Sequence, residues 1–381
     1  MEEPTFDPEL ELTSAEKVAG NEDLATEIFI HLPAASLAPC LQVSKLWLSF
    51  ILNQTFVSRH TILYPPSLSG LFLLPRQTPQ NPQLHFLSLN LSKPDLDPFV
   101  LFINSKGVQI LHSCNGLMLC KWGSLHYVCN PSTGQLKVLP NCSYMEKEFT
   151  LALAFDPLTS PGYKVVCIQK LDSHYQIAVY SSETCLWSLS KESVYAPNYV
   201  HLKDGVFCYG SIHWLTGISG GAYFDFKTWM LRDMPQPPRQ EDESQYKLKY
   251  FGKSQGYLVY VISRPLLNQY EIFQMKGDYS GWDLKFRFNL NLLAAKFPVM
   301  ARHFGSHHLF SEYECDVLCI NHADSDDDME MVLSIPGEVI FFNLKKKTSM
   351  KVRDPIFGSC DVTIWYKTYS VYEYFETLSL V

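Results

Sequence analysis

Apolar residues recur at helical spacing near the amino end of the chain, within residues 21–60. Leu24, Ile28 and Leu32 lie four residues apart, and Pro33 follows directly. Proline lacks the amide hydrogen that a continuing helix needs, so the run should end there. The pattern predicts an amphipathic helix with one apolar stripe.

Two further short helices are predicted after this first one. Asn21 or Asp23 can cap the first helix, because a short polar side chain accepts a hydrogen bond from a free amide. Ser36 is expected to cap the second helix and Ser44 to begin the third. Their apolar residues are Leu37, Leu41 and Val43 in the second, and Trp47, Phe50 and Ile51 in the third.

This helical segment carries more large apolar side chains than a bundle of about 40 residues can bury. An apolar face left over in this way usually marks a protein partner. The alternative is a three-helix cap that packs on its own C-terminal domain.

The strings LPAASL, VSKLW and NQTFVSRH resemble the F-box, the motif by which substrate receptors dock onto the Skp-type adaptor of Skp/cullin/F-box ubiquitin ligases. The general motif opens with a Leu-Pro pair, whereas this chain has Gly20 and Asn21 there. The resemblance implies that the adaptor contacts, or their immediate support, are Leu24, Ile28, Leu32, Pro33, Leu37, Val43, Ser44 and Trp47.

Beyond Pro65 and Pro66 the helical periodicity gives way to short β-rich runs that repeat. Asn or Asp starts a turn by bonding its own backbone, and Gly134 supplies a permissive conformation at such a corner. The spacing of Asn130, Thr133 and Pro140 recurs in Asp225, Thr228 and Pro235.

Further units follow at intervals of about 45 residues, which is typical of a β-propeller. One contains Ser181 and Thr184, and others begin at Gly256 and Asp316. We expect a small all-α module followed by an all-β domain, a six- or seven-bladed propeller, with a pair of β-sandwiches still open. The predicted division is a disordered acidic tail (1–20), the helical module (21–62), a linker (63–67) and the β domain (68–381).

The β-rich segments resemble the F-box-associated domain of plant F-box proteins, which is propeller-like and related to kelch domains. The strings HSCNGLMLC, CNPSTGQLKVLP, FDPLTSPGYKVV and GSIHWL carry this likeness. Together the two resemblances imply a non-catalytic substrate-recognition subunit, which binds the Skp-type adaptor, through it cullin, and an unknown target protein. The alternatives are a scaffold that forms no ligase and an enzyme of the kelch-like propeller kind.

The amino-acid composition limits the classes of partner that this protein is expected to bind. The chain has 381 residues, 46% of them hydrophobic and 18% charged, as expected for a globular protein. A net charge of -8 argues against nucleic acid or an anionic membrane as a partner. The acidic start has no secretory signal, and no apolar run is long enough to span a bilayer. We therefore expect the cytoplasm or nucleus, with the 11 cysteines reduced.

Candidate chemical groups are present but poorly arranged for catalysis or metal binding. Residues of zinc-binding type gather between residues 303 and 322, without a CxxC pair or a finger spacing. They are His303, His307, His308, Cys315, Cys319 and His322. We expect Cys315 and Cys319 to be buried on one face of a strand.

Two other groups of residues are equally poor candidates for a metal site or a catalytic site. The acidic run from Asp324 to Glu330 lacks the ordered ligands of a calcium loop. His112 and Cys114 lack an orienting third group. The sequence therefore predicts no catalytic residue, metal or cofactor, and it leaves the residues that bind the target unknown.

Overall fold

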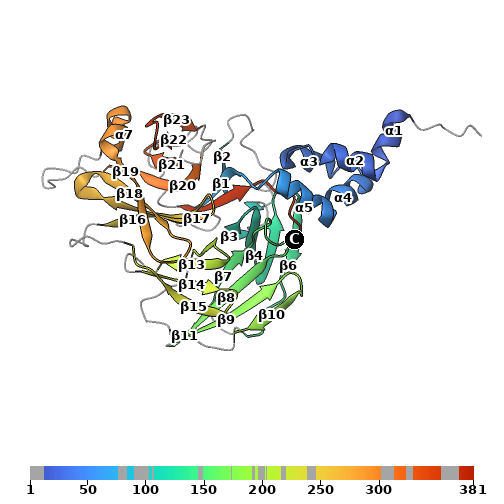
Figure 1. The fold of residues 1–381 in the computed structure, drawn as a ribbon, viewed down its shortest axis with the longest axis horizontal. Coiled ribbons are helices and arrows are strands. Elements are labelled where there is room, and N and C mark those ends of the chain that lie inside the picture. The colour runs from blue at the N-terminus through green and yellow to red at the C-terminus, as the bar shows by residue number, and fades with distance from the viewer. Residues whose placement is uncertain are drawn as a thin grey trace, which may run out of the picture.

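The computed structural model places a row of short helices at one end of a β-propeller (Figure 1). The structure describes residues 13–75, 84–89, 103–104, 107–144, 149–172, 174–190, 194–195, 202, 204–215, 220–237, 246–301, 313–322, 329–352 and 369–381. The statements below concern these residues. No described helix has the length and apolar character needed to cross a bilayer.

The helical module contains more helices than the three expected. They are α1 (Ser14–Ala19), α2 (Glu22–Phe29), α3 (Ala34–Cys40), α4 (Lys45–Ile51) and α5 (Gln54–Leu63). The predicted caps of α2 and α4 are confirmed, since Asn21 accepts from Leu24 N at 3.1 Å and Ser44 accepts from Trp47 N at 3.1 Å.

Three sequence expectations about this module need correction. The second helix begins at Ala34 rather than after Ser36, because the extended Pro33 already starts it. Helix α1 forms inside the predicted disordered tail, where Thr13 and Glu16 make a reciprocal capping box; residues 1–12 lie outside the described residues. Helix α5 forms where only a trailing segment was expected, with Asn53 as its N-cap.

Six antiparallel sheets form the blades of the propeller, so the six-bladed alternative is confirmed. In chain order the second to fourth blades are β3 (Gln109–Cys114), β4 (Leu117–Trp122), β5 (Leu125–Asn130) and β6 (Gln135–Val138); β7 (Phe149–Ala154), β8 (Lys164–Leu171), β9 (His174–Ser181) and β10 (Leu186–Leu189), with β11 (Val194–Tyr195) paired to β9; and β12 (Val206–Cys208), β13 (Ser211–Leu215), β14 (Gly221–Asp225) and β15 (Met230–Met234).

The fifth and sixth blades carry longer strands. They are β16 (Lys247–Ser254), β17 (Tyr257–Arg264), β18 (Gln269–Met275) and β19 (Trp282–Asn289), followed by β20 (Asp316–His322), β21 (Met329–Ile335), β22 (Glu338–Asn343) and β23 (Ser349–Val352). The 3-10 turns η2 (Pro265–Leu267) and η3 (Pro298–Met300) and the helix α7 (Leu290–Lys296) lie in or after the fifth blade.

The first blade joins the two ends of the β domain. Its strand order is β2 (His85–Ser88), β1 (Leu68–Pro75) and β24 (Tyr369–Phe375), so the last strand of the chain pairs with the first. Residues of β24 also line a cavity on the axis of the ring, as residues of the first strands of other blades do. This pairing closes the ring, because it ties the two ends of the domain into one sheet.

The repeated turn predicted from the sequence recurs in four blades. In each of these blades the turn begins at the last residue of the third strand. The residue four positions later has a positive φ, and its N–H donates to the carbonyl of that last strand residue. These pairs are Asn130 with Gly134, Ser181 with Cys185, Asp225 with Trp229, and Asn343 with Lys347. The polar residue at the start of the turn therefore occupies the same position in each of these four blades, and we call it the turn marker.

Buried clusters between neighbouring blades settle the closure that strand patterns left open. Each of six apolar clusters combines side chains from two adjacent blades, and the last joins the sixth blade to the first. A pair of sandwiches would not give this cyclic order. The tryptophans add polar ties, because Trp187 Nε1 donates to Pro140 O and Trp282 Nε1 donates to Pro235 O, at 2.7 and 2.8 Å.

The expectation that Cys315 and Cys319 share one strand face is wrong. Both are buried, but Cys315 packs between the fifth and sixth blades and Cys319 between the sixth and first. A β-bulge between Val317 and Cys319 shifts the register and reverses which face each later side chain takes.

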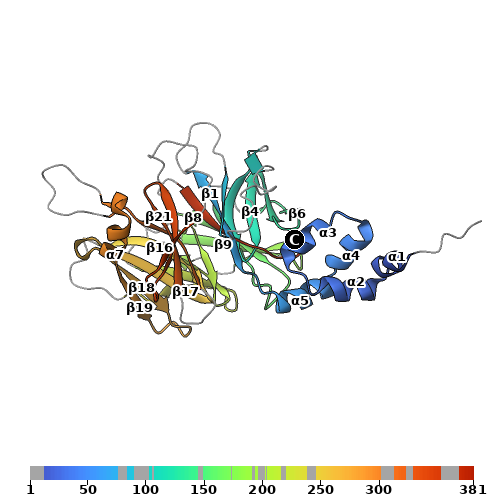
Figure 2. The same ribbon diagram turned by 90° about the horizontal axis from the view of Figure 1, so that it is seen from above.

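The last residues of the chain connect the propeller to the helical module. In both views the C-terminus lies beside α5 and β6 (Figures 1 and 2). Asn130 Nδ2 donates to the carbonyls of Thr377 and Ser379, at 3.0 and 2.8 Å, while Leu378 is buried in the core of the helical module. Alternating residues of this C-terminal segment (377–381) thus bind the two parts of the molecule.

Gly116, in the turn between β3 and β4, lets the C-terminal segment approach the second blade. Its φ is +95°, and an added Cβ would lie 2.3 Å from Thr377 Cγ2. Only glycine satisfies both the backbone conformation and the close contact.

Candidate functional site

An apolar surface on α2 remains exposed although the helical module has its own core. Ala25 and Phe29 point into that core, whereas Leu24 and Ile28, on the other side of the helix, are 50% and 52% exposed. Exposed pairs four residues apart on one helix form a continuous strip. The sequence predicted both residues as contacts, and the structure leaves both accessible.

The turns that flank α3 add more of the predicted residues to the surface. Pro33 is exposed before the helix and Leu32 is half-buried beside it. Val43, after the helix, is 62% exposed, and Ser44 is exposed while capping α4. These residues belong to connections between helices, and Leu32 also packs against the core of the module.

Two of the predicted residues serve the interior. Leu37 is fully buried in the core of the module. Trp47 is half-buried, packs edge-on against Phe29 with ring centroids 4.9 Å apart, and donates its indole N–H to Ala19 O at 3.0 Å. Their positions fit a supporting role rather than direct contact.

Helix α5 enlarges the exposed apolar area in a way that sequence reasoning missed. Ile62 and Leu63 are 72% and 55% exposed. Arg59, on the preceding turn, pairs with Glu27 of α2 at 3.2 Å, and Tyr64 Oη donates to His31 O at 2.7 Å. The signal was present, since Asn53 precedes a helix-compatible run, but that run was not assigned to a helix.

His60 fixes the packing of α5 against the turn after α2. Its Nε2 lies 2.8 Å from Leu32 O, and its ring stacks between those of Phe56 and Tyr64. Burial lowers the pKa of His60, opposed by the contact with the Leu32 carbonyl. The imidazole therefore favours its neutral form, which suits a structural residue.

Gly20 and Asn21, which replace the Leu-Pro pair, form the junction of α1 and α2. Gly20 ends α1 with its N–H bonded to Glu16 O, and Asn21 caps α2. Trp47 bonds Ala19 at the same junction. The two residues therefore connect an additional helix to the module.

The candidate catalytic pair on β3 is arranged for structure. His112 contacts the Gly205 carbonyl through Nε2 and accepts from Leu153 N through Nδ1 at 3.3 Å. Cys114 donates to Phe155 O at 3.3 Å, and burial raises the pKa of its thiol to about 12. A thiol with that pKa is not a nucleophile near neutral pH.

The candidate metal ligands are only partly described. Within the described ranges, no group of three or more His, Cys, Asp or Glu residues is placed to hold a metal ion. His303, His307, His308 and most of the acidic run lie outside those ranges, and so does the side chain of His322. The ten described cysteines are free thiols.

The comparisons with known proteins agree with this architecture. The profile of the F-box associated beta propeller domain matches residues 66–253. F-box protein At5g07610 of Arabidopsis thaliana is 28% identical over 380 residues, covering 90% of this chain and 87% of that protein. Putative F-box protein At5g15660 of the same plant is 23% identical over 363 residues, covering 87% and 80%.

A kelch-related protein is also similar. Putative F-box/kelch-repeat protein At3g17570 of Arabidopsis thaliana is 26% identical over 224 residues, covering 54% of this chain and 56% of that protein. Among solved structures, the nidogen/laminin complex aligns with a TM-score of 0.40 at 10% identity, covering 82% of this chain and 100% of that chain. The propeller assignment rests on the six sheets described above.

The described residues form a short helical module joined to a closed six-bladed propeller. Residues 66–253 thus match the F-box associated beta propeller domain, and most of the chain is similar to F-box proteins of Arabidopsis thaliana.

Proposed function

We propose that this protein is the substrate-recognition subunit of a Skp/cullin/F-box ubiquitin ligase. The helical module binds the Skp-type adaptor, and the propeller binds a target protein. The protein itself breaks and forms no bonds; it raises the effective concentration of the target near the ligase.

The exposed strip of Leu24 and Ile28 carries this proposal. These side chains stay accessible while Ala25, Phe29 and Leu378 complete the core behind them. A small module that already has a core does not need those residues for its own folding. Their exposure therefore supports a partner interface, continued by Leu32, Pro33 and Val43 along the same module.

The testing experiment measures affinity for a Skp-type adaptor. The double variant Leu24→Asp/Ile28→Asp should lose at least about tenfold in affinity, because two central apolar contacts are replaced by charges. The matched control is Leu186→Asp, which places the same charge at a 64% exposed leucine of β10 and should bind normally. Full adaptor affinity of the double variant would refute the site.

A second arm tests the ligase role. Cullin should co-purify with the wild-type protein through the adaptor, and a target should accumulate when ubiquitin transfer is blocked. Recovery of the adaptor without cullin would favour the non-degradative scaffold.

A further inference from the structure

The axis of the propeller contains a cavity of about 890 Å³. It is lined by β3, β12, β16, β20 and β24, by residues following β7, and by the linker residues Pro65 to Ser67. A volume of this size is in the range that holds a drug-sized molecule or a peptide end. We call this cavity the central channel.

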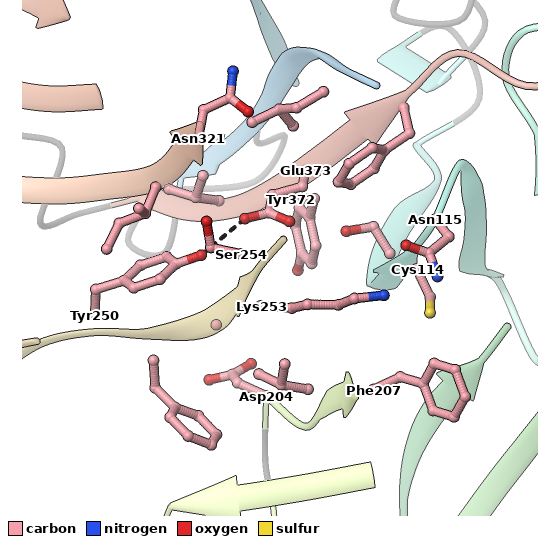
Figure 3. Close-up of a pocket in the computed structure, with 18 of the residues that line it drawn as sticks. Cys114, Asn115, Asp204, Phe207, Tyr250, Lys253, Ser254, Asn321, Tyr372 and Glu373 are labelled. Atoms are coloured by element: carbon pink, nitrogen blue, oxygen red, sulfur yellow. Dashed lines mark hydrogen bonds between the residues drawn. The ribbon is translucent and has the colours of Figure 1, made fainter. Parts of the chain in front are cut away.

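Lys253 lines the central channel and has no close partner among the residues that the structure describes. Figure 3 shows its side chain extending across the channel from β16, with the ammonium toward Asn115 and Cys114. Among the described residues none accepts a hydrogen bond from Lys253 or lies within ion-pair distance of it. By contrast, Lys249 on the same strand pairs with Asp316 at 3.0 Å.

Glu373 on β24 does not neutralise Lys253 fully. Its Oε1 accepts a hydrogen bond from Tyr250 at 3.0 Å (Figure 3). Burial raises the pKa of Glu373 to about 7, opposed by Tyr250 and Lys253. This shift favours the protonated form of the carboxyl group, which can donate a hydrogen bond.

The other carboxylates lining the channel are engaged or lie at its surface. Asp156 accepts from Leu158 N at 3.1 Å, within a turn, and Asp204 is an exposed residue. Apolar and aromatic walls complete the channel, and they include Phe207, Phe251 and Phe375. An apolar molecule with one anionic end would match these walls and the unpaired ammonium.

We propose that the central channel binds an organic carboxylate, with Lys253 as its counter-ion and Glu373 as a second polar contact. The carboxylate belongs to a small aromatic acid or to the C-terminus of a peptide, two sources that share the same chemistry. The proposal does not depend on adaptor binding, and its test uses the full chain without the adaptor.

The experiment titrates matched probes into the full-length protein and follows binding by ligand-observed NMR. Benzoate and naphthoate are compared with their neutral amides, and a Gly-Gly-Phe peptide with a free C-terminus is compared with its amidated form. At least one acid should bind at least about tenfold more tightly than its amide, because only the acid pairs with the ammonium. The type of acid that binds identifies the source.

Substitutions locate the binding. Lys253→Met keeps the length of the side chain and should abolish the preference for the acid. Lys227→Met makes the same change at an exposed lysine away from the channel and should leave it intact. Circular dichroism and an unchanged midpoint of denaturant unfolding would show that the Lys253→Met protein is folded.

The pH dependence provides a separate readout. The groups that face Glu373 are Tyr250 and Lys253 from β16, Cys319 from β20 and Cys114 from β3. Because the pKa of Glu373 is about 7, affinity for the acid should fall about tenfold between about pH 6 and about pH 8. Glu373→Gln, which cannot ionise, should remove this dependence.

Three results would overturn the proposal. They are equal affinity of the wild-type protein for acids and amides, an unchanged preference in Lys253→Met, and absence of binding by every acid in the set up to about 10 mM.

Discussion

The helical module and the propeller bury their apolar side chains in different ways. Each blade has a neighbour on both sides, so the six clusters between blades form a closed cycle. The module has one small cluster, which takes Leu378 from the C-terminal segment and still leaves Leu24 and Ile28 exposed. A ring satisfies its own edges, whereas a short helical array depends on residues from elsewhere.

The C-terminal segment links these two parts of the molecule. Its bonds to Asn130 anchor it on the second blade, and Leu378 inserts into the module. The segment therefore completes the core of the weaker part and helps to fix the position of that part on the stronger one.

The largest effect is expected from Leu378→Ala. Removing a fully packed leucine side chain should destabilise the helical module by about 2–5 kcal/mol, while the propeller keeps its stability. Hydrogen exchange should then accelerate across residues 22–63 and stay slow in the blades. Leu136→Ala, at a 53% exposed leucine of β6, is the control and should change neither part. Unchanged exchange in the module of Leu378→Ala would show that its core is self-sufficient.

Acid should weaken the propeller through His213. This buried imidazole lies 2.7 Å from Tyr279 Oη and 3.2 Å from Val206 O, and burial lowers its pKa to about 4. An unfolded histidine has a pKa of about 6.5, so the unfolded chain binds the proton first as pH falls. The free energy of unfolding should therefore drop between about pH 6.5 and about pH 4, by about 3 kcal/mol in total.

The control for this acid effect is His213→Gln, which has no group that titrates in that range. Denaturant unfolding followed by tryptophan fluorescence, at a series of pH values, should show a flatter profile for the variant. A profile as steep as that of the wild-type protein would assign the acid sensitivity to other groups.

A matched pair of turn variants separates the local role of Asn130 from its role as an anchor. Asn130 and Asp225 start equivalent turns, accepting from Ser132 N and Lys227 N, both at 2.9 Å. Only Asn130 also bonds the C-terminal segment. We expect Asn130→Ala to cost about 1–3 kcal/mol, because two buried carbonyls lose their donor, and Asp225→Ala to cost about 1 kcal/mol.

Hydrogen exchange distinguishes the members of this pair. Residues 377–381 should exchange faster in Asn130→Ala and at the wild-type rate in Asp225→Ala. Equal exchange in the two variants would argue that the apolar contacts of the segment are sufficient to hold it.

The smallest effect concerns the ties between blades. Trp187→Phe and Trp282→Phe each remove an indole N–H that donates to a proline carbonyl of the preceding blade. Each should lower the free energy of unfolding by about 1 kcal/mol, without changing exchange in the helical module. Trp122→Phe, at a 51% exposed tryptophan, is the control and should have little effect on the midpoint of denaturant unfolding.

Local patterns in the sequence were sufficient to predict the polar residues that start the repeated turns and the N-caps of two helices. Asn21 and Ser44 cap helices because a cap needs only residues up to three positions away. The markers Asn130, Ser181 and Asp225 recur because each blade repeats the same local turn. The exposure of Leu24, Ile28 and Val43 also agrees with their prediction as contact residues, which remains a prediction until binding is measured.

Other features depend on residues that are distant in the chain. Periodicity did not reveal that Leu378 belongs to the core of the helical module. The sequence of an extended terminal segment has no pattern that identifies the residues against which it packs. Alternation along one expected strand placed Cys315 and Cys319 on one face, but β20 begins only after Cys315 and its bulge reverses the alternation. That Lys253 has no close partner among the described residues becomes evident only when β3, β12, β16, β20 and β24 surround one cavity.

The sequence by itself determined the kind of elements, the repeat and the apolar surplus near the amino end, because these depend on spacing along the chain. The tertiary structure decided the number of blades, the closure of the ring and which apolar side chains remain exposed. Those properties depend on contacts such as Asn130 with Ser379, 249 residues apart, and a contact of that range is fixed only when the whole chain has folded.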